Sequence, residues 1–236
     1  MKYSGSLVKE ERASIFKLFL DREKLKFNEI EKEIKISSNM VAYHIEKMQK
    51  EGLLEKKGDY YYLTKNSEKY IPIFSHLTGK ELSPLPVILV AIVNKNKILM
   101  IKRNKRPYKN YWSMIGGKML MEETFESASV RQVKEKTGLD AKFISINSVM
   151  HERVEGQETI KHSFILFFTK MATSATKFIE TENGKLKWFT LTQLKKEKVI
   201  PSDRWLIENK LNSNIEVKSA FMTENEGELT SFKILR

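Results

Sequence analysis

The chain has 236 residues, of which 41% are hydrophobic and 31% charged, a balance that suits one large folded domain or two modest ones. It contains no cysteine, so disulfides and thiolate metal sites are excluded, and its four histidines form no HxxxH or HExxH pattern of a zinc site. The formal net charge of +12 favours a polyanionic partner and a lysine-rich soluble surface equally.

The sequence offers no segment that would enter a membrane. Residues 1–12 are polar and lack the apolar region of a secretory signal. The longest apolar run, Val87–Val93, is too short to cross a bilayer. We therefore expect a cytoplasmic protein without a membrane partner.

Three helices and a hairpin are predicted in the first 75 residues. Val41, Ile45 and Met48 recur at i, i+4 and i+7, which predicts a helix that Gly52 ends. Apolar patterns predict two earlier helices, and two β-prone arms around a Lys-Gly-Asp turn predict a hairpin. These segments are Ala13–Leu20, Phe27–Ile36 and Leu53–Thr64. A further helix is expected over Lys65–Leu77.

The stretch ISSNMVAYHIEKMQKEGLLEKKGDYYYLT resembles the recognition helix and wing of winged helix-turn-helix regulators of archaea and bacteria. The resemblance implies that the third helix enters the major groove of DNA while the wing meets phosphates. The candidate DNA-binding residues are Ser38, Asn39, Tyr43, Lys47, Lys56 and Lys57. Winged helices also serve as dimerisation or protein-contact modules. Residues 1–76 hold fifteen Lys and Arg against twelve Asp and Glu, and this +3 gives little non-specific affinity for DNA.

A domain boundary is predicted where Gly, Ser and two Pro precede a strand-like run. We expect a winged helix-turn-helix domain at 1–78, a linker at 79–86 and a second domain with a C-terminal extension at 87–236. In the second domain, strands are predicted at Val87–Val93 and Ile98–Lys102, followed by a basic loop.

The segment from Tyr111 to Leu139, YWSMIGGKMLMEETFESASVRQVKEKTGL, resembles the Nudix box. The matching positions, without a gap, are Gly117, Glu123, Arg131, Val133, Glu135, Gly138 and Leu139. The resemblance implies an α+β chain overall, with a Nudix α/β/α sandwich around a mixed sheet in the second domain. It also implies hydrolysis of a nucleoside diphosphate linked to another group, with Mg²⁺ held by carboxylates on one side of a helix over 123–137.

Two positions depart from the family pattern, which has Glu where this chain has Gln132 and Lys136. Mg²⁺ prefers anionic oxygen ligands, and an ammonium near its position is unfavourable. We therefore expect weak or absent hydrolysis and disfavour Mg²⁺ as a cofactor. If the domain is active, Glu135 and Glu123 are the candidate catalytic residues and metal ligands. An altered metal site, built with the further acids Glu122, Glu126 and Glu180 or Glu182, is the alternative.

Lys136 suggests a second hypothesis, in which its ammonium takes the place of the metal and pairs with a diphosphate. The candidate ligand-binding residues are Lys136, Gln132, Arg131, Arg103, Arg106, Gly116 and Gly117. Equally, the basic residues among them are consistent with a solvated surface. Tyr108 and Trp112 are candidates for stacking on a base or for the core, and the core is favoured for Trp112.

Beyond the box, strands are predicted at Lys142–Val149, Ile160–Thr169 and Lys185–Thr190, then two short helices and a hairpin near residues 224–227. The favoured function is a DNA-binding transcription regulator, a homodimer by analogy, whose Nudix domain senses a nucleotide-type small molecule. The competing hypotheses are an active Mg²⁺-dependent Nudix hydrolase with an accessory winged helix, and a protein-interaction module. The ligand and the operator are not predicted.

Overall fold

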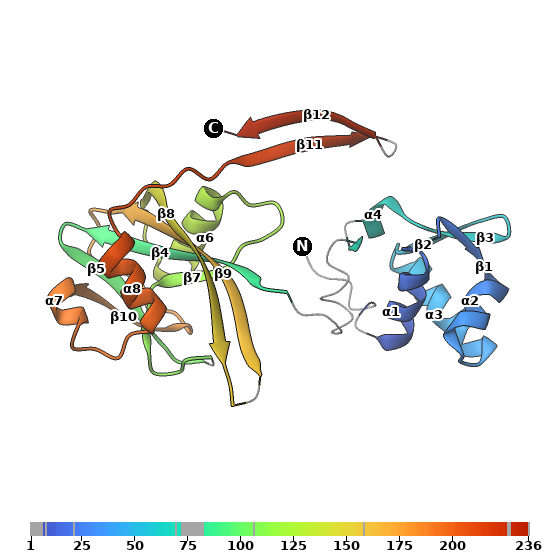
Figure 1. The fold of residues 1–236 in the computed structure, drawn as a ribbon, viewed down its shortest axis with the longest axis horizontal. Coiled ribbons are helices and arrows are strands. Elements are labelled where there is room, and N and C mark those ends of the chain that lie inside the picture. Colours follow the sequence, from blue (N-terminus) through green and yellow to red (C-terminus); the bar gives the residue numbers. More distant parts are fainter. Residues whose placement is uncertain are drawn as a thin grey trace. The chain divides into compact units, whose positions relative to one another are not determined.

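The computed structural model describes residues 7, 9–20, 22–68, 70–71, 83–105, 107–157, 159–225 and 228–235. The chain divides into two compact units, Met1–Ser83 and Pro84–Arg236, which are described separately below (Figure 1). No helix in the described ranges is long and apolar enough to cross a membrane.

The first unit packs three helices against a small antiparallel sheet (Figure 1). Val41, Ile45 and Met48 are all buried on one side of a helix, as their spacing predicts, and they share a core with Ile15 and Phe16. The sheet has the order β1-β3-β2. The elements are α1 (Glu10–Leu18), β1 (Lys24–Lys26), α2 (Phe27–Ile34), α3 (Ser38–Lys50), β2 (Leu54–Lys57), β3 (Tyr60–Leu63) and α4 (Lys65–Glu68).

The first unit differs from the sequence prediction in two details. Strand β1 was not expected, and it exists because Lys24–Lys26 pairs with Tyr60–Tyr62 of β3. The helix expected over Lys65–Leu77 covers Lys65–Glu68, and residues 72–82 lie outside the described part of the chain.

The second unit is a sheet covered on both faces, with the strand order β10-β5-β4-β9-β8 (Figure 1). Strand β4 is parallel to β9 and antiparallel to β5, so the sheet is mixed as predicted. Short strands β6 and β7 pair with β5 and β4. The elements are β4 (Leu85–Asn94), β5 (Lys97–Arg103), β6 (Trp112–Ser113), β7 (Ile115–Lys118), α6 (Phe125–Thr137), β8 (Lys142–Glu155), β9 (Ile160–Ala172), β10 (Gly184–Thr190), α7 (Leu191–Leu194), α8 (Pro201–Lys210), β11 (Ser219–Asn225) and β12 (Glu228–Leu235).

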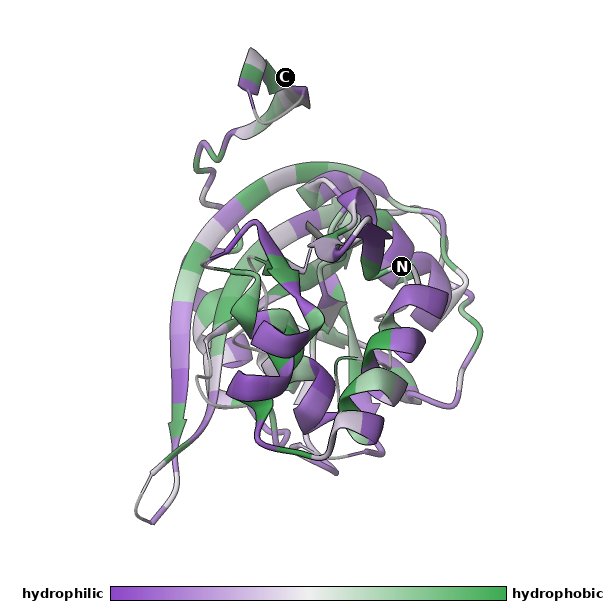
Figure 2. Cartoon of the chain, turned by 90° about the vertical axis from the view of Figure 1, so that its right-hand side faces the viewer, coloured by the Kyte–Doolittle hydropathy of each residue, from purple (hydrophilic) through white to green (hydrophobic). Residues whose placement is uncertain are grey.

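Alternation along β4 builds the two cores of the sandwich. Ile88 and Val90 pack in a cluster with Val133 of α6, whereas Leu89 and Ala91 pack in a cluster that includes residues of α8. Side chains on a strand point alternately to opposite faces, so an apolar run without polar interruption is buried on both sides. Figure 2 shows that hydrophilic and hydrophobic residues alternate along the helices, as in amphipathic helices.

The predicted C-terminal hairpin is present as β11 and β12, joined in an antiparallel register from Ser219↔Leu235 to Asn225↔Glu228. The segment before it is held on β8, where the Asn147 amide donates to the carbonyls of Lys210, Leu211 and Ser213 at 2.8–3.1 Å.

Candidate functional site

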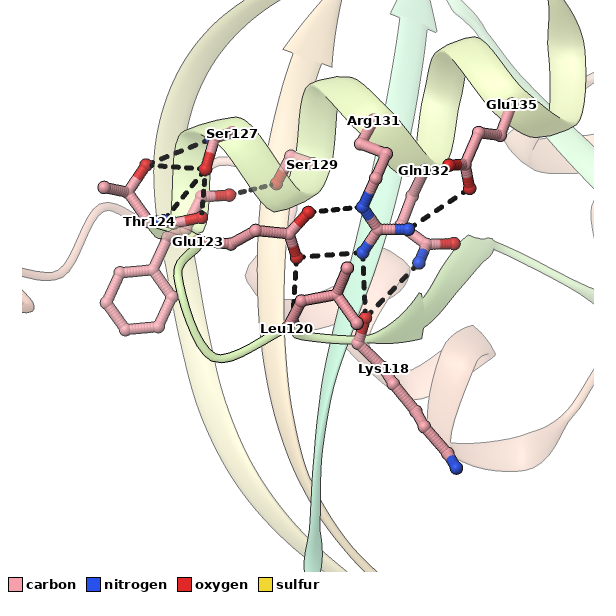
Figure 3. A network of polar contacts seen from close by, with 10 residues as sticks. Lys118, Leu120, Glu123, Thr124, Ser127, Ser129, Arg131, Gln132 and Glu135 are labelled. Carbon is pink, nitrogen blue, oxygen red and sulfur yellow. Dashed lines mark hydrogen bonds and ion pairs between the residues drawn. The ribbon is translucent and has the colours of Figure 1, made fainter. Parts of the chain in front are cut away.

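Helix α6 carries three of the seven matching Nudix-box residues, Arg131, Val133 and Glu135, and local sequence fixes both of its ends; Figure 3 shows its start. The Thr124 hydroxyl accepts from the Ser127 amide at 3.1 Å, while the Ser127 hydroxyl accepts from the Thr124 amide at 2.8 Å. The helix therefore begins at Phe125, two residues later than predicted. Gly138 ends it with a φ of 70°, a left-handed conformation that favours glycine.

Glu123 and Arg131 form the centre of a polar network at the start of this helix (Figure 3). The Arg131 guanidinium donates to both carboxylate oxygens of Glu123, one of them at 2.9 Å, and also to the Lys118 carbonyl at 3.1 Å. The Leu120 amide donates to Glu123 at 2.8 Å. The Glu123 carboxylate thus holds the loop between β7 and α6, and these bonds lower its pKa, the Arg131 hydrogen bond most.

Replacing Glu123 by Gln is expected to lower the free energy of unfolding of the second unit by roughly 1–3 kcal/mol at pH 7. The lowered folded-state pKa means that the stabilisation is present above the ordinary value of 4.5 and is lost as the pH falls through the folded pKa. Urea unfolding followed by tryptophan fluorescence measures it, because all three tryptophans lie in the second unit. The control Glu126→Gln changes an exposed acid in the first turn of α6. Equal effects of both variants would contradict the assigned role.

The three helix positions to which the Nudix-box pattern assigns acids hold an amide, an acid and an ammonium here. Gln132 is buried, and its Nε2 donates to the Lys118 carbonyl at 3.4 Å. A Cβ on Gly117 would lie 2.6 Å from the Gln132 amide, so a larger residue there would displace the end of the Gln132 side chain. Glu135 is exposed and accepts from Arg131 at 3.2 Å. The half-buried Lys136 donates to the Gly116 carbonyl.

These residues do not fit a divalent metal ion. A magnesium site needs several oxygen ligands, usually carboxylates, whereas Glu135 is paired with Arg131 and the Lys136 ammonium lies in the same cluster. Within the described ranges, no three His, Asp or Glu side chains are gathered as a metal site would require. Two acids of the alternative site are engaged elsewhere, since Glu180 accepts from the Leu186 amide and Glu182 pairs with Lys105.

The surroundings of Lys136 disfavour the charged form of its side chain. Burial lowers the pKa of the Lys136 ammonium to about 8, and the positive charges of Arg103 and Arg131 add to this effect, while Glu135 opposes it. Lys136 is therefore a half-buried cation that lies among other cations.

A pocket of about 370 Å³ opens in the second unit beside this cluster. Its wall includes Gly116 and Gly117, the basic residues Arg103 and Lys118, and several aromatic and apolar residues of β4 and β9. A pocket of this size and mixed lining is typical of small-molecule sites. The pocket is also lined by Tyr108, Glu152, His162 and Asp203.

Asp203 is one of several polar residues of this pocket, with Lys118, Glu152 and His162, that were not predicted from the sequence. It lies in the first turn of α8, is buried, and accepts from the Met114 amide at 2.6 Å. Burial raises the pKa of its carboxyl to about 7, and the negative charge of Glu152 adds to the effect. An acid directly after Pro201-Ser202 was the available signal, but it predicted only a helix start.

The two aromatic candidates from the sequence have different environments. Trp112 is in the core, edge-on to Phe189 at 4.9 Å between ring centroids. Tyr108 lines the pocket, and its ring makes an edge contact with His162 at 6.3 Å. Burial raises the pKa of the Tyr108 hydroxyl, which has no hydrogen-bond partner among the described residues. The predicted ligand residue Arg106 lies outside the described part of the chain.

The candidate DNA-binding residues belong to α3 and to the β2–β3 hairpin. Tyr43 is 46% exposed, with the Lys47 ammonium 5.8 Å from its ring centroid. Asn39 is exposed, and the Ser38 hydroxyl donates to Glu31 of α2. In the hairpin, Lys56 and Lys57 are exposed, and Lys57 pairs with Glu55 at 2.6 Å.

A family model for the NUDIX domain matches residues 83–209, more than half of the chain, and the chain belongs to the Nudix family. ADP-ribose pyrophosphatase of Methanocaldococcus jannaschii is 41% identical over 68 residues, which are 29% of this chain and 40% of that protein. Uncharacterized Nudix hydrolase YvcI of Bacillus subtilis is 21% identical over 140 residues, or 59% of this chain and 87% of that protein. Among solved structures, the NUDIX domain of Shewanella oneidensis NrtR complexed with ADP ribose has a TM-score of 0.49 and 16% identity, covering 60% of this chain and 94% of that chain.

Proposed function

We propose that this protein is a DNA-binding transcription regulator whose Nudix domain binds a nucleotide diphosphate derivative and hydrolyses it weakly or not at all. The observation that carries the proposal is the ligand-sized pocket beside a Nudix helix in which an amide and an ammonium replace two acids. A site that keeps the Nudix helix and its Glu123–Arg131 pair, but lacks the carboxylate ligands of a metal ion, is suited to binding a nucleotide and not to hydrolysing it.

The pocket contains groups suited to the diphosphate of a nucleotide and others suited to its base. Backbone at Gly116 and Gly117, together with Arg103 and Lys118, supports a diphosphate. Tyr108 offers an aromatic surface, and Asp203 offers a buried carboxyl that can hydrogen-bond to a nucleobase. Because one relative is named for ADP-ribose, this compound is the first probe to titrate into the full-length protein by calorimetry. Saturable one-to-one binding supports the proposal, and absence of binding contradicts it for this ligand.

We assign the first unit the role of a winged helix, in which α3 is the recognition helix and the β2–β3 hairpin is the wing. The order of three helices followed by a hairpin supports this assignment. Exposed Tyr43 and its neighbour Lys47 on α3, with the two hairpin lysines, supply aromatic and basic side chains suited to DNA. A homodimer would match the two-fold symmetry of a palindromic operator.

The variant Tyr43→Ala/Lys47→Ala is expected to weaken binding to a duplex of its own promoter by at least about tenfold and to reduce the salt slope by about one. The control Lys50→Ala removes an exposed lysine of α3 that is paired with Glu46, and it should leave affinity nearly unchanged. Fluorescence anisotropy at several salt concentrations measures both. Binding that is equal in wild type and the double variant would exclude this surface of α3.

The second candidate is an active Mg²⁺-dependent Nudix hydrolase with an accessory winged helix. Two features favour it: the relatives are named as hydrolases or pyrophosphatases, and Glu135 and Glu123 are retained. A panel of nucleoside diphosphate derivatives, assayed with Mg²⁺ for phosphomonoester products, separates this candidate from the regulator. Turnover at rates typical of enzymes would favour the hydrolase.

A further inference from the structure

Two cations beside the pocket have no carboxylate partner in the described part of the chain. The Lys136 ammonium donates to the Gly116 carbonyl, and the Arg103 Nε donates to the Pro107 carbonyl at 2.9 Å. Neither forms an ion pair with any described acid, and Glu135, the sequence neighbour of Lys136, pairs with Arg131. A half-buried charge without a counter-ion is unfavourable, so an anion bound at this place would stabilise the site.

We propose that Lys136 and Arg103 bind the diphosphate of the nucleotide directly, as a built-in substitute for a divalent metal ion. The inference deepens the proposed function and rests on it. Two monovalent cations carry the same total charge as one divalent ion, but they are covalently part of the protein. Binding is therefore independent of free metal.

Both side chains keep donors available for phosphate oxygens. An ammonium has three N–H donors, of which the Gly116 carbonyl takes one. A guanidinium has five, and the Arg103 Nε–H is the donor already engaged, which leaves the two terminal nitrogens. These terminal donors form the fork that binds phosphate oxygens in pairs.

The charges around the pocket also indicate where the phosphates bind. Glu152 and Asp203 line the pocket and would repel a phosphate when ionised. Gly116 lines the pocket together with Gly117, Lys118 and Arg103. Lys136 is not itself a lining residue, but its ammonium reaches this wall through its hydrogen bond to the Gly116 carbonyl. The diphosphate is therefore assigned to this glycine-containing wall, and the rest of the ligand to the part lined by acids and aromatic residues.

Calorimetric titrations of ADP-ribose and of inorganic pyrophosphate into the full-length protein, in EDTA and in Mg²⁺, test the inference. Equal affinity for ADP-ribose in both buffers is expected. Lys136→Met should weaken binding by at least about tenfold, and Lys136→Arg should restore most of it. The control Lys134→Met removes an exposed lysine of the same helix, paired with Asp140 at 2.7 Å, and should change nothing.

The other outcomes separate this inference from the proposed function. ADP-ribose binding that requires Mg²⁺, or that Lys136→Met leaves unchanged, overturns the inference and leaves nucleotide binding intact. Pyrophosphate binding in EDTA without ADP-ribose binding keeps the cation site and removes the nucleotide function. If neither compound binds in either buffer, both the cation-site inference and the proposed nucleotide binding are overturned.

Discussion

Replacing Asp203 by Asn is expected to abolish a large pH dependence of stability in the second unit. The folded-state pKa of about 7 lies above the ordinary value of 3.8, so the folded protein holds this proton more tightly than the unfolded chain. Stability from this group is fully present below about pH 4, falls as the pH rises toward 7, and does not fall further above it. The total loss is on the order of 4 kcal/mol.

Urea unfolding of wild type and Asp203→Asn at pH 4.5 and pH 8, followed by tryptophan fluorescence, measures this effect. From pH 4.5 to pH 8, the difference in the free energy of unfolding between Asp203→Asn and wild type should shift in favour of the variant, by on the order of 2–4 kcal/mol. Asp140→Asn, which changes an exposed acid, should show no such gain. A constant difference between Asp203→Asn and wild type at both pH values would show that the carboxyl is ionised in the folded protein throughout.

The double variant Gln132→Glu/Lys136→Glu is expected to gain Mg²⁺-dependent hydrolysis of ADP-ribose, by at least about tenfold over wild type. The substitutions place acids beside Glu135 and remove the ammonium from the cluster, which supplies the oxygen ligands that Mg²⁺ prefers. Release of phosphomonoester products with and without EDTA is the measurement.

A matched control separates the position of the new acids from their charge. Gln132→Glu/Lys134→Glu has the same net charge as the double variant, but it changes a lysine that is exposed and paired with Asp140. It should remain close to wild type. Activity that stays at the wild-type level in a folded Gln132→Glu/Lys136→Glu protein would contradict the claim that the missing acids limit hydrolysis.

The sequence predicted those parts of the fold that depend on repeated apolar spacing. The stripe Val41, Ile45 and Met48 is buried as expected, and so is the apolar run of β4, which has buried residues on both faces. Strand β1 was missed because three residues are too short to show a period, and its pairing depends on β3, more than thirty positions away. The start of α6 was misplaced because Thr124 caps the helix instead of joining it.

Residues of the candidate site were predicted from the sequence where they belong to a local pattern, and were missed where only tertiary packing brings them together. The spacing of the Nudix box is local, so Glu123, Arg131 and the substituted positions 132 and 136 were identified from sequence. The buried Asp203 was not, because its hydrogen-bond partner Met114 is 89 positions away and only tertiary packing brings them together. Tyr108 has a φ of 62°, an unusual backbone conformation that no local pattern indicated.

We propose that this Nudix domain binds a diphosphate through protein cations and not through a divalent metal ion. Titration of Mn²⁺ into the full-length protein, followed by electron paramagnetic resonance, tests it most directly. We predict that the ion stays free in solution at micromolar concentrations, with Glu135 engaged by Arg131 and Lys136 near the place where a metal would bind. Tight, stoichiometric binding that Glu135→Gln abolishes would contradict the claim.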